Sequence, residues 1–260
     1  MRGFRPGPGE VRLWWIEPGT PAPGPLAPDE EARARAMAEP RARAAYALRR
    51  GALRLLLGHC LDLPPERVPL ATERGGRPVL AAPVLAAPVL AAPVLAAPGG
   101  AAPLTFSVSQ ATGAWAVIAL APGGPLGVDV ETHGQPGERG EHGQHLDIAG
   151  LARRFLPDLD LDAVRPEERP PVFWRAWTRY EATLKAAGAT LGQRPGPQAA
   201  HWTVTRPPAP RGHTVALVTA RPPTTVTTRL FRAPTACAAT PEGLFDDHAT
   251  PEHPGPQRHR

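Results

Sequence analysis

Long apolar segments, paired cysteines and the features of a signal peptide are absent from this sequence. No stretch approaches the roughly 20 consecutive apolar residues that a membrane-spanning helix needs. The first ten residues contain arginine, but the apolar run that follows, Val11–Ile16, is too short for a signal-peptide core. Cys60 and Cys237 are far apart and lack metal-ligand spacing, so we expect no disulfide framework. These absences predict a soluble protein of the cytoplasm that has no membrane partner.

Basic residues outnumber acidic ones, which gives a formal charge of +5 and an isoelectric point near 10.1. This balance favours an anionic partner, which could be nucleic acid, a phosphorylated small molecule or an acidic protein surface. The arginines fall on predicted helices without interleaved aromatic residues, and no helix-turn-helix or zinc-finger pattern occurs. We therefore expect no nucleic-acid partner, while the other two kinds of anion stay open.

Hydrophobic periodicity, with proline and glycine as punctuation, predicts a chain that mixes helices and short strands. The predicted strands are 11–16, 104–109, 114–120, 126–131, 201–205 and 213–219. The predicted helices are 29–38, 41–61, 147–155 and 171–188. Three short strands in succession favour an antiparallel meander over alternating βαβ units, and hence an α+β arrangement.

Four segments are predicted to be irregular. Residues 78–98 repeat Pro-Val-Leu-Ala-Ala, and proline at every fifth position excludes a continuous helix or a central strand, so an expanded loop is expected. Residues 133–145 are glycine-rich with irregularly spaced histidines, which favours a plain loop over a zinc site. Residues 1–10 are predicted to be a flexible start, and residues 221–260, rich in proline and threonine, a disordered tail.

The helix predicted at 41–61 carries two kinds of stripe. One is apolar and includes Tyr46, whereas the other brings Arg43, Arg50 and Arg54 close together. Because exposed arginine is the ordinary case, these arginines can simply form a solvated face. Binding of an anion is the alternative, and the helix alone does not decide between the two.

Carboxylates occur at two places that a fold could bring together. In Gly127-Val-Asp-Val-Glu131, residues two apart on a strand point the same way, so Asp129 and Glu131 share one face. On the helix 171–188, Glu181 and Lys185 follow two aromatic residues at four-residue steps. Three clustered carboxylates repel one another unless a cation lies between them, and Mg²⁺ accepts such oxygen ligands together with substrate phosphates.

Lys185 is the only lysine in a chain that otherwise uses arginine for its cationic side chains. A compact ammonium group four residues after a site carboxylate indicates a specific requirement at that position. An ordinary Glu-Lys pair on a helix, which contributes a few tenths of a kcal/mol, is the alternative.

The strand motif Gly127-Val-Asp-Val-Glu131, followed by Trp177-x-x-x-Glu181-x-x-x-Lys185 on a helix, resembles the 4'-phosphopantetheinyl transferases of the larger, two-lobed, Sfp-like class. That family's pattern also has a Gly-Lys-Pro turn and a strand ending in Ser-His. Gly76-Arg77-Pro78 resembles the turn with arginine in place of lysine, and Phe106–Ser109 resembles the strand.

Two positions depart from the family pattern. Gln110 stands where the family has the histidine of Ser-His, and Tyr180 stands where it has the lysine just before the site glutamate. In the family both groups help to hold coenzyme A phosphates. Each charge-assisted contact contributes about 1.5 to 3 kcal/mol, so the departures imply weaker binding or reliance on Arg77 and Arg179.

The resemblance implies an α/β (α+β) fold of two similar lobes related by a pseudo-two-fold axis. Each lobe would be a small antiparallel sheet packed with helices, and coenzyme A would lie in the cleft between them. The N-terminal lobe would span 11–122 and the C-terminal lobe, with the metal site, 123–220.

The resemblance also implies a function. Such an enzyme moves the phosphopantetheine arm of coenzyme A to a serine of an apo acyl or peptidyl carrier protein with Mg²⁺, releasing adenosine 3',5'-bisphosphate. The implied catalytic residues are Glu181 and Lys185, the metal ligands are Asp129, Glu131 and Glu181, and the coenzyme A contacts are Arg43, Arg50, Arg77, Pro78 and Gln110. A monomer is expected. The alternative is a catalytically weakened family member that binds a carrier protein or coenzyme A.

Overall fold

The computed structural model describes residues 4–73, 76–81, 103–111, 115–132 and 147–232. The strands are β1 (Glu10–Ile16), β2 (Leu70–Thr72), β3 (Pro78–Leu80), β4 (Leu104–Gln110), β5 (Ala116–Pro122), β6 (Leu126–Thr132), β7 (Thr203–Thr205), β8 (His213–Thr219) and β9 (Thr225–Phe231). The helices are α1 (Pro28–Arg35), α2 (Pro40–Leu61), α3 (Ile148–Phe155) and α4 (Arg169–Ala187), with 3₁₀ turns η1 (Pro65–Arg67), η2 (Pro166–Glu168) and η3 (Pro197–His201). The predicted α/β (α+β) class is confirmed.

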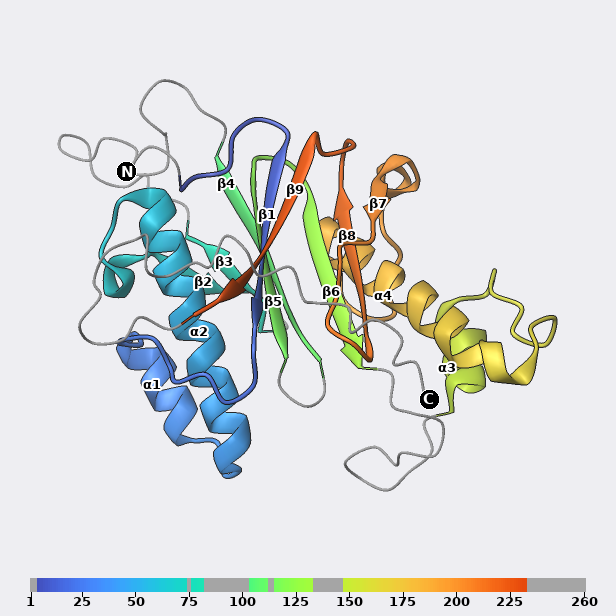
Figure 1. Cartoon of the computed structure of the whole chain (residues 1–260), viewed down its shortest axis with the longest axis horizontal. Coiled ribbons are helices and arrows are strands. Elements are labelled where there is room, and N and C mark those ends of the chain that lie inside the picture. Colours follow the sequence, from blue (N-terminus) through green and yellow to red (C-terminus); the bar gives the residue numbers. More distant parts are fainter. Residues whose placement is uncertain (1–3, 74–75, 82–102, 112–114, 133–146, 233–260) are drawn as a thin grey trace, which may run out of the picture.

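Two sheets lie between two groups of helices, with α1 and α2 on one side and α3 and α4 on the other (Figure 1). The first sheet has the strand order β4-β5-β1-β9 and the second has the order β6-β8-β7. Alternate residues of β1, β5, β6 and β8 form one apolar cluster between the sheets, whereas the other residues of β1 and β5 pack against α2. This is the two-sided burial expected when each sheet is covered on both faces.

The chain passes from the first sheet to the second between Pro122 and Leu126. Gly123 and Gly124 both have positive φ there, a conformation that glycine adopts without steric cost. The predicted three-stranded meander is therefore wrong, because β6 does not follow β5 into the same sheet. Both edges of β5 are already taken, by β4 and β1, so β6 pairs antiparallel with β8 instead.

Strand β9 corrects two expectations. The tail predicted from residue 221 does not begin there, because Thr225–Phe231 forms a strand and Phe231 is buried in the core of the first sheet. The strand runs parallel to β1, so this sheet is mixed and not purely antiparallel. The run of β-branched residues Thr224–Thr228 is the sequence signal that could have predicted the strand.

The ends of α2 follow from local chemistry. The carboxylate of Glu39 accepts a hydrogen bond from the backbone N–H of Ala42 at the first turn, and Asp62 ends the helix with a left-handed backbone. Cys60 on this helix is a buried free thiol, and burial raises its pKa to about 12. Cys237 lies outside the described residues.

The irregular segments are only partly within the described structure. The start of the repeat, Pro78–Leu80, forms β3 and pairs antiparallel with β2, whereas residues 82–98 lie outside the described residues. The histidine-containing segment 133–145 also lies outside them.

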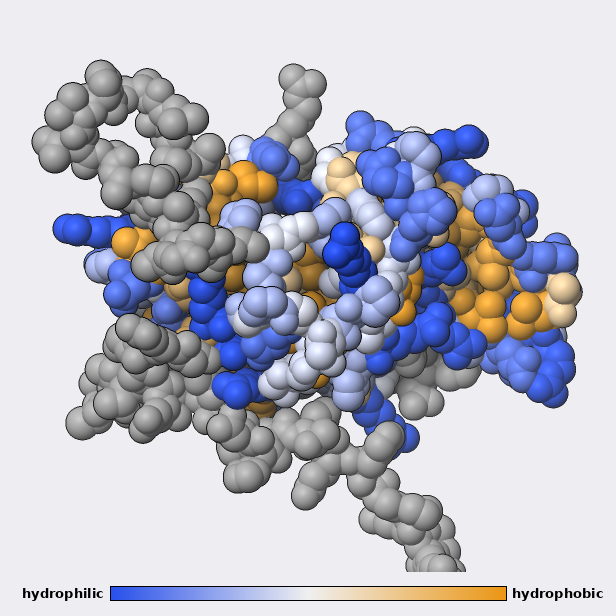
Figure 2. Space-filling model, turned by 90° about the horizontal axis from the view of Figure 1, so that it is seen from above, coloured by the Kyte–Doolittle hydropathy of each residue, from blue (hydrophilic) through white to orange (hydrophobic). Residues whose placement is uncertain are grey.

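The helices and the surface show two further features. None of the described helices has the length and hydropathy needed to cross a membrane. Figure 2 shows apolar side chains reaching the surface at the end of the molecule where α3 lies. Among the partly buried apolar residues that pack against the α3–α4 core are Leu151 and Phe155.

Candidate active site

Strand β6 presents its carboxylates on the face that α4 covers. Val128 and Val130 are fully buried on the opposite face, in the cluster between the sheets. Asp129 is 1% exposed and Glu131 is half-buried, and both line a cavity together with residues of α4. The alternation predicted from the sequence therefore places these two carboxylates side by side.

Gly127 explains how α4 comes close enough to complete the site. A Cβ atom at this position would lie 1.9 Å from the carbonyl oxygen of Ala182 and 2.7 Å from the backbone nitrogen of Ala186. Only glycine permits this approach of helix to strand. Glu181 and Lys185 lie on the same stretch of α4, so the glycine brings their side chains to Asp129.

Asp129, Glu131 and Glu181 form an acidic cluster. One carboxylate oxygen from each lies within 4.8 Å of the others. Burial, together with the neighbouring charges of Asp129 and Glu181, raises the pKa of Glu131 from 4.5 to about 8. Burial and the charge of Asp129 likewise raise the pKa of Glu181. Mutual repulsion of this kind is what a bound cation would relieve.

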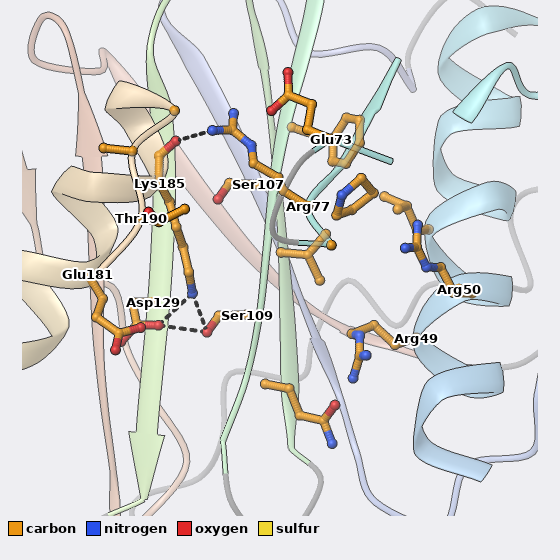
Figure 3. Close-up of a pocket in the computed structure, with 18 of the residues that line it drawn as sticks. Arg49, Arg50, Glu73, Arg77, Ser107, Ser109, Asp129, Glu181, Lys185 and Thr190 are labelled. Atoms are coloured by element: carbon orange, nitrogen blue, oxygen red, sulfur yellow. Dashed lines mark hydrogen bonds and ion pairs between the residues drawn. The ribbon is translucent and has the colours of Figure 1, made fainter. Parts of the chain in front are cut away.

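Lys185 brings a positive charge to the cluster. Its Nζ lies 2.6 Å from Oδ1 of Asp129 and 2.8 Å from Oγ of Ser109, and Ser109 Oγ lies 2.8 Å from the same Oδ1 (Figure 3). Within the part of the chain that the structure describes, Oδ2 of Asp129 is buried with no hydrogen-bond donor. An acidic cluster with one buried, unpartnered oxygen fits a hard divalent cation.

The site opens into a cavity of about 440 Å³. In Figure 3 Asp129, Glu181 and Lys185 lie on one wall, while Arg49 and Arg50 of α2 lie on the opposite wall. Of the residues predicted to contact coenzyme A, the cavity is lined by Arg50, Arg77, Pro78 and Gln110. Arg43 is not among the lining residues; it is exposed, and its Nη2 donates to the carbonyl oxygen of Met37.

The arginines of α2 are mostly not a solvated face. Arg54 is buried, and its Nε lies 2.5 Å from Oε2 of Glu30, a buried carboxylate of α1. Arg50 is also buried, with Nη1 3.7 Å from Oε1 of Glu30. The solvated-face reading is therefore wrong for Arg50 and Arg54 and right for Arg43.

A second cation on the α2 wall, Arg49, was missed by the sequence analysis. The guanidinium carbons of Arg33, Arg49 and Arg50 lie 5.8, 5.9 and 5.6 Å from the ring centroid of Tyr46. Burial, followed by the charge of Arg50, lowers the pKa of Arg49. Clustered guanidinium groups at a cavity wall favour an anion there.

Arg77 contacts the end of α4. Its Nη1 donates to the carbonyl oxygen of Lys185 at 2.8 Å, close to the C-terminal end of α4. Gly188, in the left-handed conformation, ends the helix at this point. A cation here interacts favourably with the carbonyl groups at the C-terminal end of the helix.

Tyr180 lies away from the cavity. Its ring centroid is 6.3 Å from that of Phe155 on α3 and 6.1 Å from that of Trp177. The side chain therefore belongs to the aromatic packing between α3 and α4. Tyr180 is not among the residues that line the cavity.

Comparisons with known proteins converge on the resemblance seen in the sequence. Residues 125–238 match the family model described as the 4'-phosphopantetheinyl transferase superfamily. The chain is also 28% identical over 188 residues to the 4'-phosphopantetheinyl transferase HetI of Nostoc sp. strain PCC 7120, with 69% of each chain covered. The family match spans β6 and α4, which carry the acidic cluster and Lys185.

Proposed function

We propose that this chain, whose residues 125–238 match the 4'-phosphopantetheinyl transferase superfamily, moves the phosphopantetheine arm of coenzyme A to a serine of an acyl or peptidyl carrier protein. The proposal includes dependence on Mg²⁺, release of adenosine 3',5'-bisphosphate and the two-lobed, Sfp-like architecture. The observation that carries it is the acidic cluster with Lys185 facing an arginine wall across one cavity.

The two walls suit the two anionic groups of coenzyme A. The pyrophosphate would lie against the acidic wall, where a divalent cation and Lys185 provide positive charge. The 3'-phosphate would then lie toward Arg49 and Arg50, while Arg77 lines the cavity between the walls. Arginine suits phosphate because its planar fork of donors matches the phosphate oxygens.

The residues that would hold Mg²⁺ are Asp129, Glu131 and Glu181. When bound, the ion supplies charge neutralisation at the phosphate oxygens. The Oδ2 atom of Asp129 is the best candidate for a direct ligand, since Oδ1 is already occupied by two hydrogen-bond donors.

The proposed reaction forms one bond and breaks one. The serine oxygen of the carrier attacks the β-phosphorus of coenzyme A, and the bond from that phosphorus to the bridging oxygen breaks. The serine proton passes to Glu181, directly or through a water molecule, and the electron pair of the broken bond stays on adenosine 3',5'-bisphosphate. Lys185, held beside Asp129, would donate hydrogen bonds to the phosphate oxygens as their charge grows.

A second candidate is a binding protein that keeps the fold and recognises a carrier protein or coenzyme A. Gln110 and Tyr180 are the observations that favour it, because neither brings a positive charge to the cavity. The acidic cluster and Lys185 favour the enzyme, since simple binding would not require three converging carboxylates.

Intact-mass measurement of an apo carrier protein tests the proposal. The carrier is incubated with the chain, coenzyme A and Mg²⁺, and we expect it to gain the mass of one phosphopantetheine group. A carrier whose target serine is replaced by alanine should gain none. If the wild-type chain binds coenzyme A but modifies no carrier, the binding-protein candidate replaces the enzyme.

A further inference from the structure

Two serines of β4 contact the neighbouring edge of β6. Ser107 Oγ accepts a hydrogen bond from the backbone N–H of Val128 at 3.0 Å, and Ser109 Oγ accepts one from the N–H of Val130 at 3.3 Å. Strand β6 pairs with β8 along its other edge, so the serine hydroxyls take the place of a neighbouring strand. Both serines are buried, and they join the first sheet to the second.

Only Ser109 also contacts the acidic cluster. Its Oγ lies within 2.8 Å of both Lys185 Nζ and Asp129 Oδ1. The ammonium of Lys185 and the N–H of Val130 can only donate, and a hydroxyl group has one proton and two acceptor lone pairs. The proton of Ser109 therefore points to Asp129, and the hydrogen-bonding capacity of the hydroxyl is filled.

This arrangement distinguishes the two oxygens of Asp129. Oδ1 receives hydrogen bonds from Ser109 and from Lys185, whose Nζ is 2.6 Å away. Oδ2, which has no donor among the described residues, belongs to the carboxylate that clusters with Glu131 and Glu181. With Oδ1 held by two donors, rotation of the carboxylate would break both hydrogen bonds.

We propose that Ser109 is a positioning residue for the cation site. It fixes the Asp129 carboxylate so that Oδ2 is offered to a divalent cation, and it holds the ammonium of Lys185 beside Oδ1. The inference rests on the proposed function, because it assigns Ser109 a role toward the cation of that same site. Groups that orient a metal ligand in this way typically change metal affinity by about 10- to 100-fold when removed.

Ser107 provides a matched control. Ser107→Ala and Ser109→Ala each remove one hydroxyl that accepts an N–H of β6, so both weaken the junction between the sheets in the same way. Only Ser109→Ala removes a donor to Asp129 and an acceptor for Lys185. Ser109→Thr keeps the hydroxyl and serves as the rescue variant.

The experiment is a titration of each purified full-length protein with Mn²⁺ alone, with free Mn²⁺ measured by electron paramagnetic resonance. We expect Ser109→Ala to bind Mn²⁺ about 10- to 100-fold more weakly than wild type. Ser107→Ala should stay within about threefold of wild type, and Ser109→Thr should recover most of the affinity. Melting temperatures measured in parallel should fall in both alanine variants, and further in Ser109→Ala because it loses two more hydrogen bonds.

Each result is decisive. Equal Mn²⁺ affinity of wild type and Ser109→Ala overturns the role of Ser109 and leaves the transferase proposal intact. Equal losses in Ser107→Ala and Ser109→Ala also overturn it, because the junction between the sheets would then account for the effect. If wild type binds no Mn²⁺, the proposed role of Ser109 is wrong. The intact-mass measurement of the carrier protein then decides separately whether the chain is a transferase.

Discussion

Glu131→Gln should stabilise the protein when no divalent cation is present. Burial and the charges of Asp129 and Glu181 raise the pKa of Glu131 from 4.5 to about 8 in the folded protein. Below pH 4.5 the carboxyl is protonated in both the folded and unfolded states, so Glu131 does not lower the free energy of unfolding. Between pH 4.5 and 8 the folded state binds more protons than the unfolded state, so the free energy of unfolding falls as pH rises. Above pH 8 Glu131 is ionised in both states, and the free energy of unfolding is lowered by the full amount.

The size of the effect follows from the two pKa values. The rise from 4.5 to about 8 corresponds to about 5 kcal/mol at 1.36 kcal/mol per pKa unit. The side chain is only half-buried, and solvent screening reduces the penalty, so we expect about 2 kcal/mol. For a protein of this size that amounts to a melting temperature roughly 4 to 8 °C higher in the variant.

Thermal unfolding in a chelator between pH 5 and 9 measures this effect. The melting temperature of Glu131→Gln should exceed that of wild type increasingly as pH rises, and saturating Mg²⁺ should remove or reverse the difference. Glu66→Gln, at an exposed position, is the matched control and should follow wild type. A constant difference between Glu131→Gln and wild type at every pH would refute the reasoning, because it would show that Glu131 ionises normally.

Substitutions at three more positions test other parts of the structure. Gly127→Ala should destabilise the protein by about 1 to 3 kcal/mol or more in chemical denaturation and weaken Mn²⁺ binding, because the new methyl group clashes with the α4 backbone. Glu30→Ala should cost about 3 to 5 kcal/mol of stability in the same assay, since it leaves the guanidinium of Arg54 buried without its carboxylate, and Glu30→Asp should cost less. Gln110→His should tighten coenzyme A binding in calorimetry by about fivefold at pH 6 and by less at pH 8, because only the charged imidazole adds an ionic contact; equal affinities at the two pH values would contradict this.

The residues of the acidic cluster could be identified from the sequence because two periodicities carry them. Alternation along β6 places Asp129 and Glu131 on one face, and the four-residue steps on α4 align Glu181 with Lys185. Their convergence could not be read from either pattern, because it depends on the close approach of α4 at Gly127. The structure brings these side chains together, while their chemical roles remain predictions.

Other contacts in the site could not be predicted from the sequence. Ser109 falls in the strand that resembles the family's Ser-His strand, but its contact with Asp129 depends on the fold placing β4 beside β6. Glu30 is one of several acidic residues at the start of α1. Arg49 differs from its neighbours on α2 only in where its side chain points. Tyr180 was judged by family analogy to be a lost phosphate contact, whereas its ring packs between α3 and α4.

The fold shows the same division between local and long-range information. Most helices and strands were predicted near their observed positions, because local periodicity decides them. The change of sheet at β6 was not predicted. It depends on β1 pairing with the edge of β5 that β4 leaves free, and the two strands are far apart in the sequence. The parallel pairing of β9 with β1 joins the two ends of the described chain, and no short-range pattern encodes it.

Crystals of the protein grown with coenzyme A and Mn²⁺ test the central claim most directly. We expect an anomalous scattering peak from the ion within about 2 to 2.5 Å of Oδ2 of Asp129, with Glu131 or Glu181 as a further ligand and the pyrophosphate of coenzyme A against the ion. The 3'-phosphate should lie on the side of the cavity formed by Arg49 and Arg50. Coenzyme A bound in the cavity with the ion elsewhere, or with no ion at the acidic cluster, would contradict the account.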